Sequence, residues 1–202
     1  MKILIIGIAR SGTTSLLNGI SKQGYTKIYE PYFDKNNNKK FTLSNGNIVV
    51  KTIIGQLPKN YKKEWKEFIK ELILKFDRII WLDRKNITEH CESFINLHYR
   101  SSLEPPTSVS KKWKMDEIPK SFNTEDYYKT LRTALEKEKQ TFKELVDELN
   151  YKITWYEDLY NKDRIHSFET INKWNLELDS FDLNEYLTPS KKYRQYTKSS
   201  LI

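Results

Sequence analysis

The apolar residues of this chain fall into short runs that alternate with longer segments of helical periodicity. Residues 2–8 (KILIIGI) are almost continuously apolar, which is typical of a strand buried on both faces of a parallel sheet. Further runs of strand character lie at 26–31, 47–53, 77–84 and 151–156. Amphipathic helices are predicted between them, over 13–22, 61–76, 86–100 and a long segment that begins at Asn123 or Thr124. The alternation predicts a three-layer α/β fold with a central, mainly parallel sheet of about five strands flanked by helices.

The domain organisation follows from the spacing of these elements. The chain has 202 residues, which suits one well-packed domain over 1–202, and it contains no internal repeat and no clean linker. Residues 101–123 hold three prolines and several serines and lysines, so we expect a lid or an acceptor-site loop there. Residues 188–202 form a basic, aromatic C-terminal tail.

Charge and cysteine content narrow the class of protein. The formal net charge of +8 indicates anionic partners, unless lysine serves here mainly as a solubilising residue. The single cysteine, Cys91, excludes an intramolecular disulfide and a cysteine zinc cluster, which fits a reducing compartment. The N-terminal apolar run is too short for a signal peptide or a membrane span. We therefore expect a soluble, cytoplasmic protein.

The strongest motif is GIARSGTTS, residues 7–15, which directly follows the first predicted strand. Gly7, Gly12 and Thr14 match a phosphate-binding P-loop, but Thr13 occupies the place of the usual lysine and Arg10 lies within the loop. Such a turn directs backbone N–H groups towards an anion at the positive end of a helix. Without the lysine that reaches the β- and γ-phosphates, ATP hydrolysis is disfavoured. The guanidinium of Arg10 and the hydroxyls of the loop suit a tetrahedral anion with a second group attached.

The stretch GIARSGTTSL resembles the 5′-phosphosulfate loop of sulfotransferases, which share a P-loop ancestry. Their donor is 3′-phosphoadenosine 5′-phosphosulfate (PAPS), and the transfer requires no metal. The resemblance implies that Arg10 lies near the bridging oxygen and stabilises charge on the leaving group, an effect that can be worth ~3–4 kcal/mol. It also implies that the 5′-phosphate is held by the segment Ser11, Gly12, Thr13, Thr14 and Ser15.

A second motif, WLDRKNITEHCESF, is similar to the family's 3′-phosphate site, where an Arg ends a strand and a Ser lies on the next helix. Ser93 is the serine of this pattern. Arg84 lies nine residues before it and Lys85 eight, the commoner family spacing, whereas some bacterial carbohydrate sulfotransferases carry two adjacent basic residues and an Asn. Either residue fits, and we favour Arg84. The alternative is an ordinary basic turn capped by Asn86.

A third landmark, ITWYEDLY at 153–160, is similar to a strand ending in Tyr-Glu-Asp-Leu that is common in the family. Its role there is mostly architectural, near the nucleotide. Glu157 and Asp158 are also ordinary residues for the first turn of a helix.

Transfer to a hydroxyl needs a base, which typically contributes ~10²–10⁴-fold to the rate. Cytosolic sulfotransferases use a His after a Lys-Thr or Lys-Ser pair, but Ile53 follows Lys51 and Thr52 here. Carbohydrate sulfotransferases often place a Glu within Tyr-Glu-Pro, and Glu30 lies in such a triplet, so the resemblance implies that Glu30 is the base. Lys51 either contacts the sulfuryl group or only edges the sheet.

The remaining candidates are weaker. Many family members close the donor site with a basic C-terminal segment, and Arg194, with its neighbouring lysines, is the candidate here; a frayed basic terminus fits equally well. His90 is interpreted as a hydrogen-bonded helix residue, His98 as a neighbour of the acceptor and His166 as structural. The histidines show no metal-ligand spacing.

The leading expectation is therefore a PAPS-dependent sulfotransferase that acts on a hydroxyl of an unidentified acceptor, a carbohydrate being one candidate, and releases adenosine 3′,5′-bisphosphate. One alternative is a P-loop kinase that uses magnesium and ATP on a small metabolite. Another is a non-catalytic module that binds a nucleotide or a polyanion. Nucleic acid is not expected, because the sequence carries no aromatic RNA-binding signature.

Overall fold

The sheet has five strands, all parallel. The structure is a computed structural model, and it describes residues 1–29, 45–56, 65–103 and 113–160. The strand order is β2-β3-β1-β4-β5, which places β1 between β3 and β4. The strands are β1 (Lys2–Gly7), β2 (Thr26–Tyr29), β3 (Ile48–Ile53), β4 (Arg78–Asp83) and β5 (Ile153–Trp155). The predicted central parallel sheet is confirmed.

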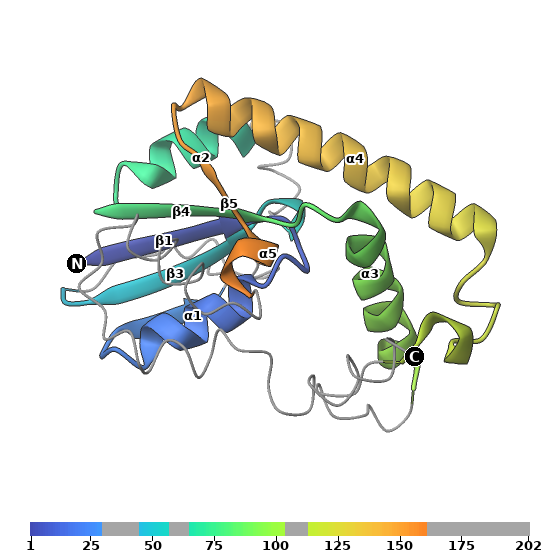
Figure 1. Ribbon diagram of the computed structural model, residues 1–202. Coiled ribbons are helices and arrows are strands. Elements are labelled where there is room, and N and C mark those ends of the chain that lie inside the picture. Colours follow the sequence, from blue (N-terminus) through green and yellow to red (C-terminus); the bar gives the residue numbers. More distant parts are fainter. Residues whose placement is uncertain (30–44, 57–64, 104–112, 161–202) are drawn as a thin grey trace, which may run out of the picture.

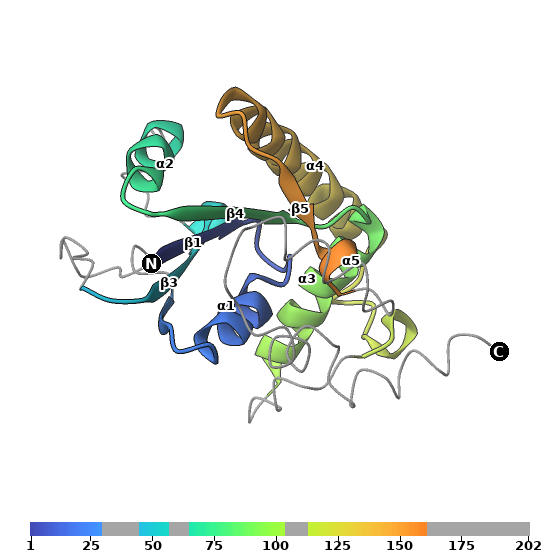
Figure 2. The ribbon, with the colours of Figure 1, turned by 60° about the vertical axis from the view of Figure 1, so that its left-hand side comes forward.

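Helices cover both faces of this sheet. They are α1 (Thr13–Ser21), α2 (Trp65–Ile73), α3 (Ile87–Ser102), α4 (Glu125–Glu148) and α5 (Tyr156–Leu159), with short 3₁₀ turns at Ile54–Gln56 and Met115–Glu117. In Figures 1 and 2, α1 lies on one face, α2 and α4 lie on the other, and α3 extends from the end of β4. This arrangement confirms the predicted three layers.

The core is divided between the two faces because successive strand residues point in opposite directions. Ile3 and Ile5 of β1 pack with the apolar face of α1, whereas Leu4 and Ile6 pack with α2 and α4. Each such buried side chain contributes about 1.5–3 kcal/mol through the hydrophobic effect. The α4 face includes an aromatic contact between Trp81 and Phe142, with ring centroids 5.5 Å apart.

The helix caps agree with the sequence. The side chain of Thr124 accepts a hydrogen bond from the Tyr127 N–H at the start of α4. Asn86 caps α3 in the same way, accepting from the N–H groups of Thr88 and Glu89. These bonds satisfy backbone donors that have no partner within the helix.

The second half of the predicted lid packs against α3. Trp113 and Ile118 are buried beside Ile95, and the Trp113 N–H donates to the side-chain oxygen of Asn96 at 2.8 Å. Residues 113–123 are therefore attached to α3 through Trp113 and Ile118, whereas residues 104–112 lie outside the described part. Within the described residues, no helix is long and apolar enough to cross a membrane.

Candidate anion-binding site

The turn between β1 and α1 needs its two glycines. A Cβ at Gly7 would lie 2.7 Å from the carbonyl oxygen of Leu82 and 2.7 Å from Cγ2 of Thr13, so a side chain does not fit. Gly12, at the N-cap of α1, has φ of +88°, and a Cβ there would lie 2.6 Å from Cδ2 of Tyr156. A positive φ is readily adopted only by glycine. Both glycines of the sequence motif are thus explained by the sharp turn and its close packing.

Arg10 lies in the middle of this loop and also has a positive φ, of 69°. Its side-chain Nε donates a hydrogen bond to Ser93 Oγ at 3.1 Å. Ser93 lies on α3, so this contact joins the loop to the segment in which the sequence predicts a second phosphate contact. The structure therefore brings together two motifs that are 83 residues apart.

The loop hydroxyls divide into an inner and an outer set. The Ser11 hydroxyl is buried and donates to the carbonyl of Ile8 at 2.6 Å, and Thr13 is buried as well. Thr14 and Ser15 are exposed on the first turn of α1. In this arrangement Thr14 and Ser15 can present hydroxyls to a ligand, whereas Ser11 and Thr13 shape the turn.

Lys51 approaches the same turn from β3. Its side chain is buried, its Nζ donates to Thr14 Oγ1 at 2.9 Å, and Nζ also lies 5.6 Å from the ring centroid of Tyr29. Because β3 is an interior strand of the sheet, Lys51 does not merely edge it. Its ammonium group instead adds positive charge at the N-terminus of α1, where the helix dipole already favours an anion.

Arg84 and Lys85, the two alternatives for the 3′-phosphate contact, point to different partners. Arg84 stacks on Tyr156, with Cζ 4.0 Å from the ring centroid, and the same ring lies against Gly12. Its Nε is buried and has no hydrogen-bond partner among the described residues. Lys85 forms an ion pair with Asp158 at 2.7 Å. Arg84 therefore lies on the ring that covers Gly12 and also donates from Nη1 to the carbonyl of Glu89 at 3.4 Å, whereas Lys85 is paired with α5. Which of the two contacts a 3′-phosphate stays a prediction.

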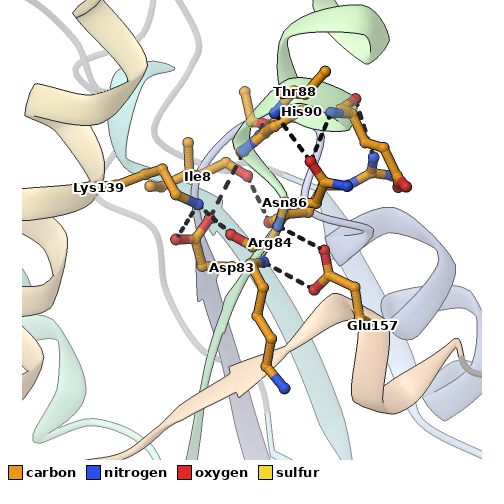
Figure 3. A network of polar contacts seen from close by, with 12 residues as sticks. Ile8, Asp83, Arg84, Asn86, Thr88, His90, Lys139 and Glu157 are labelled. Carbon is orange, nitrogen blue, oxygen red and sulfur yellow. Dashed lines mark hydrogen bonds and ion pairs between the residues drawn. The ribbon is translucent and has the colours of Figure 1, made fainter. Parts of the chain in front are cut away.

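Residues 153–160, the third sequence motif, contact both loops of the site. The Glu157 carboxylate accepts from the N–H groups of Lys85 at 2.9 Å and Asn86 at 3.1 Å, as Figure 3 shows. The Tyr160 hydroxyl donates to the carbonyl of Gly12 at 2.9 Å, and burial raises the pKa of Tyr160. Residues of α5 and its C-terminal cap thus hold both the β1–α1 loop and the turn that follows β4.

Behind the loop lies a buried polar network that the sequence analysis missed (Figure 3). Lys139 of α4 donates to Asp83 Oδ2 at 2.6 Å and to the carbonyl of Arg84. Asp83 also accepts from the Arg84 N–H at 2.7 Å. Burial raises the pKa of Asp83, and the neighbouring Lys139 opposes that rise.

A signal for this network existed in the helical periodicity of α4. The buried residues Leu135 and Phe142 lie two turns apart on the core face, and the positions between them on that face hold Glu138 and Lys139. Charged residues in an apolar stripe need buried partners. Asp83, at the end of an otherwise apolar strand, is the partner of Lys139.

His90 connects α3 to the loop. The ring is fully buried, and its Nε2 lies 2.6 Å from the carbonyl oxygen of Ala9. Burial lowers the pKa of His90 to about 4, so the ring is neutral near pH 7. His90 is therefore a hydrogen-bonded helix residue, as the sequence suggested, and its partner is the loop itself.

The remaining predicted residues lie elsewhere. The ring of His98 contacts Phe122 and Tyr127, with centroids 5.5 Å and 5.7 Å away. Glu30, Arg194 and His166 lie outside the described residues, so their predicted roles stay predictions. In the described ranges, no group of three His, Cys, Asp or Glu side chains gathers as a metal site requires.

Comparison with protein-family models, with curated proteins and with solved structures finds no match to this chain. Arg10 lies in the loop before α1, Lys51 contacts Thr14 in its first turn, and Arg84 stacks on the Tyr156 ring that lies against Gly12. Positive charge next to the N-terminus of a helix suits an anionic ligand.

Proposed function

We propose that this chain is a sulfotransferase that moves a sulfuryl group from PAPS to a hydroxyl of an acceptor. The observation that carries the proposal is the hydrogen bond between Arg10 and Ser93. Each residue belongs to a different sequence motif that resembles one half of a PAPS site. Their contact brings the two motifs to one place, and this proximity supports a donor with phosphates at both its 5′ and 3′ positions.

The 5′-phosphosulfate would lie on the first turn of α1. The backbone N–H groups of Gly12 and Thr13 and the exposed hydroxyls of Thr14 and Ser15 are the donors there. The 3′-phosphate would lie between Ser93 and Arg84, whose buried Nε has no partner in the described part of the chain. A buried donor without a partner is unfavourable unless a ligand completes its hydrogen bond.

The reaction is an in-line displacement at sulfur. A bond forms between the acceptor oxygen and sulfur, while the bond between sulfur and the bridging phosphate oxygen breaks. Glu30 receives the proton of the acceptor hydroxyl, and adenosine 3′,5′-bisphosphate leaves. Arg10 and Lys51 stabilise the negative charge that develops on the leaving phosphate, which is the step at which fixed cationic donors contribute most.

Titration calorimetry with adenosine 3′,5′-bisphosphate, compared with ATP and magnesium, tests the donor assignment. We expect the bisphosphate to bind and Arg10→Ala to weaken its binding by about tenfold or more, because hydrogen bonds to charged groups are worth about 1.5–3 kcal/mol. Arg132→Ala is the matched control: Arg132 is an exposed arginine on α4 that forms a helical ion pair with Glu136. Binding of magnesium-ATP alone would instead support a kinase. Salt-sensitive binding of a polyanion with no nucleotide binding would support a binding module.

The transfer itself is tested by an acceptor screen in which mass spectrometry detects added sulfate. We expect Arg10→Ala to abolish transfer. Glu30→Gln should slow transfer while the affinity for adenosine 3′,5′-bisphosphate is kept. Normal turnover by Glu30→Gln would refute the assignment of Glu30 as the base.

A further inference from the structure

Two side chains of α3, one helical turn apart, contact adjacent residues of the β1–α1 loop. His90 Nε2 lies 2.6 Å from the carbonyl oxygen of Ala9, and Ser93 Oγ accepts from Arg10 Nε at 3.1 Å. Residues three apart on a helix share a face, so both contacts come from the same side of α3. Helix α3 therefore contacts the loop at two neighbouring points, the backbone carbonyl of Ala9 and the side chain of Arg10.

The contact with Ala9 defines which ring nitrogen of His90 carries the proton. A carbonyl oxygen only accepts hydrogen bonds, so Nε2 must be the donor. Nδ1 lies 3.9 Å from Asp83 Oδ1 and has no hydrogen-bond partner within the described residues. Burial keeps the pKa of His90 near 4, so its single proton resides on Nε2 at neutral pH.

The charged groups around the ring favour the neutral imidazole with its proton on Nε2. Lys139 of α4 and Arg84 of the turn after β4 carry positive charges that disfavour a second proton, while Glu157 of α5 acts in the opposite direction. A negative charge on Asp83 alone would favour a proton on Nδ1 of His90. Lys139 compensates this charge, because its Nζ donates to Asp83 Oδ2 at 2.6 Å. The buried ion pair thus leaves His90 free to donate to the loop.

Arg10 needs such support, because it adopts φ of 69°, a conformation that non-glycine residues seldom hold. Backbone conformations of this kind persist where surrounding contacts determine them. The Ala9 carbonyl belongs to the peptide unit that leads directly into Arg10, so fixing this carbonyl restricts the φ of Arg10.

We propose that His90 is a positioning residue of the anion-binding site, whose Nε2–H holds the Ala9 carbonyl and thereby directs the Arg10 guanidinium towards Ser93 and the bound anion. The role in anion binding rests on the proposed function. The orientation of Arg10 does not, and it is measurable in the protein without a ligand. His90 acts through Arg10 and does not contact the reacting atoms.

A pair of variants separates hydrogen bonding from packing. His90→Gln retains an N–H donor on a side chain of similar reach, whereas His90→Met has a similar unbranched shape but no donor. The readout in each protein is the ¹H–¹⁵N signal of Arg10 Nε, assigned with Arg10→Lys. We expect slow hydrogen exchange of this signal in the wild type and in His90→Gln, and exchange faster by about tenfold or more in His90→Met.

The second readout is the affinity for adenosine 3′,5′-bisphosphate, which should fall by about tenfold in His90→Met and by less than about threefold in His90→Gln. Equal losses in both variants would show that His90 only packs, and no loss in either would refute the proposal.

If His90→Met does not fold, the ¹⁵N shifts of the wild-type ring decide, because a proton on Nδ1 would overturn the proposal. A wild type that binds no bisphosphate would refute the proposed function, while the Arg10 signal would still test the positioning.

Discussion

Replacing Lys139 by methionine should strongly destabilise the protein. The lysine side chain is 17% exposed and that of Asp83 only 2%, so the ion pair that joins them is almost completely buried. Methionine fills much of the space of the lysine stem but carries no charge. Asp83 would then keep only the N–H of Arg84 as a hydrogen-bond donor among the contacts described, and the carbonyl of Arg84 would lose its contact with Lys139.

The expected loss in the free energy of unfolding comes from leaving the buried Asp83 carboxylate without the ammonium group of Lys139. Removing one partner of a buried ion pair typically costs about 3–5 kcal/mol. A domain of this kind has about 5–15 kcal/mol of stability in total, so the loss would be a large fraction of it. With a urea m-value of about 2–3 kcal/mol/M, the unfolding midpoint should fall by about 1–2.5 M.

Urea unfolding followed by tryptophan fluorescence measures this loss, since Trp81 is buried in β4 two residues before Asp83. The double variant Asp83→Asn with Lys139→Met removes both charges and should recover at least half of the lost stability, because neutral replacements of buried pairs are often tolerated. Lys129→Met, which breaks an exposed ion pair with Glu125 on the same helix, should change stability by less than about 1 kcal/mol. A loss below about 1 kcal/mol in Lys139→Met, or no recovery in the double variant, would refute this reasoning.

Gly12→Ala should lower the free energy of unfolding by about 2–4 kcal/mol, because the new Cβ meets Tyr156 and the backbone has φ of +88°. Gly24→Ala is the matched control in the same urea assay, since Gly24 has φ of +83° with no atom within 4 Å of its Cβ position, and it should lose only about 1–2 kcal/mol. Stability should also depend on pH through His90: between the ordinary pKa of 6.5 and about 4 in the folded protein, the unfolded chain binds a proton that the native state excludes. Stability therefore rises with pH across this window, by up to about 3 kcal/mol from His90 alone. Asp83 acts in the opposite sense because burial raises its pKa, so the test is the difference between the wild type and His90→Gln, and identical pH profiles would contradict the assignment.

The elements that the sequence predicted correctly are those encoded locally. The apolar run of β1, the caps Asn86 and Thr124, and the glycines of the loop each depend on neighbours within a few residues. The strand order could not be read in the same way, because pairing between β1 and its neighbours is a contact across long stretches of chain. Where both lie within the described residues, predicted boundaries agree with the observed ones to within a few residues.

The candidate site was predictable in part. The resemblance placed Arg10 and Ser93 at one ligand; the structure shows that the two side chains are in contact, and the shared ligand stays a prediction. In contrast, Lys139 lies in the run EKEKQ, where it resembles the exposed Lys137 unless its position between Leu135 and Phe142 is considered. His90 was interpreted as hydrogen-bonded, but no sequence pattern names Ala9 as its partner, because only the folded sheet brings α3 against the loop.

The β1–α1 loop is held from several directions at once: by His90 and Ser93 of α3, by Lys51 of β3 and by Tyr160 after α5. A segment restrained in this way has lost most of its conformational entropy before any ligand arrives. Binding then costs little further ordering, and the shape of the loop should differ little between the free and the bound protein. An anionic ligand would then bind to a loop that already has its final shape. The association rate would be set by diffusion and by electrostatic attraction to the positively charged side chains of Arg10, Lys51 and Arg84.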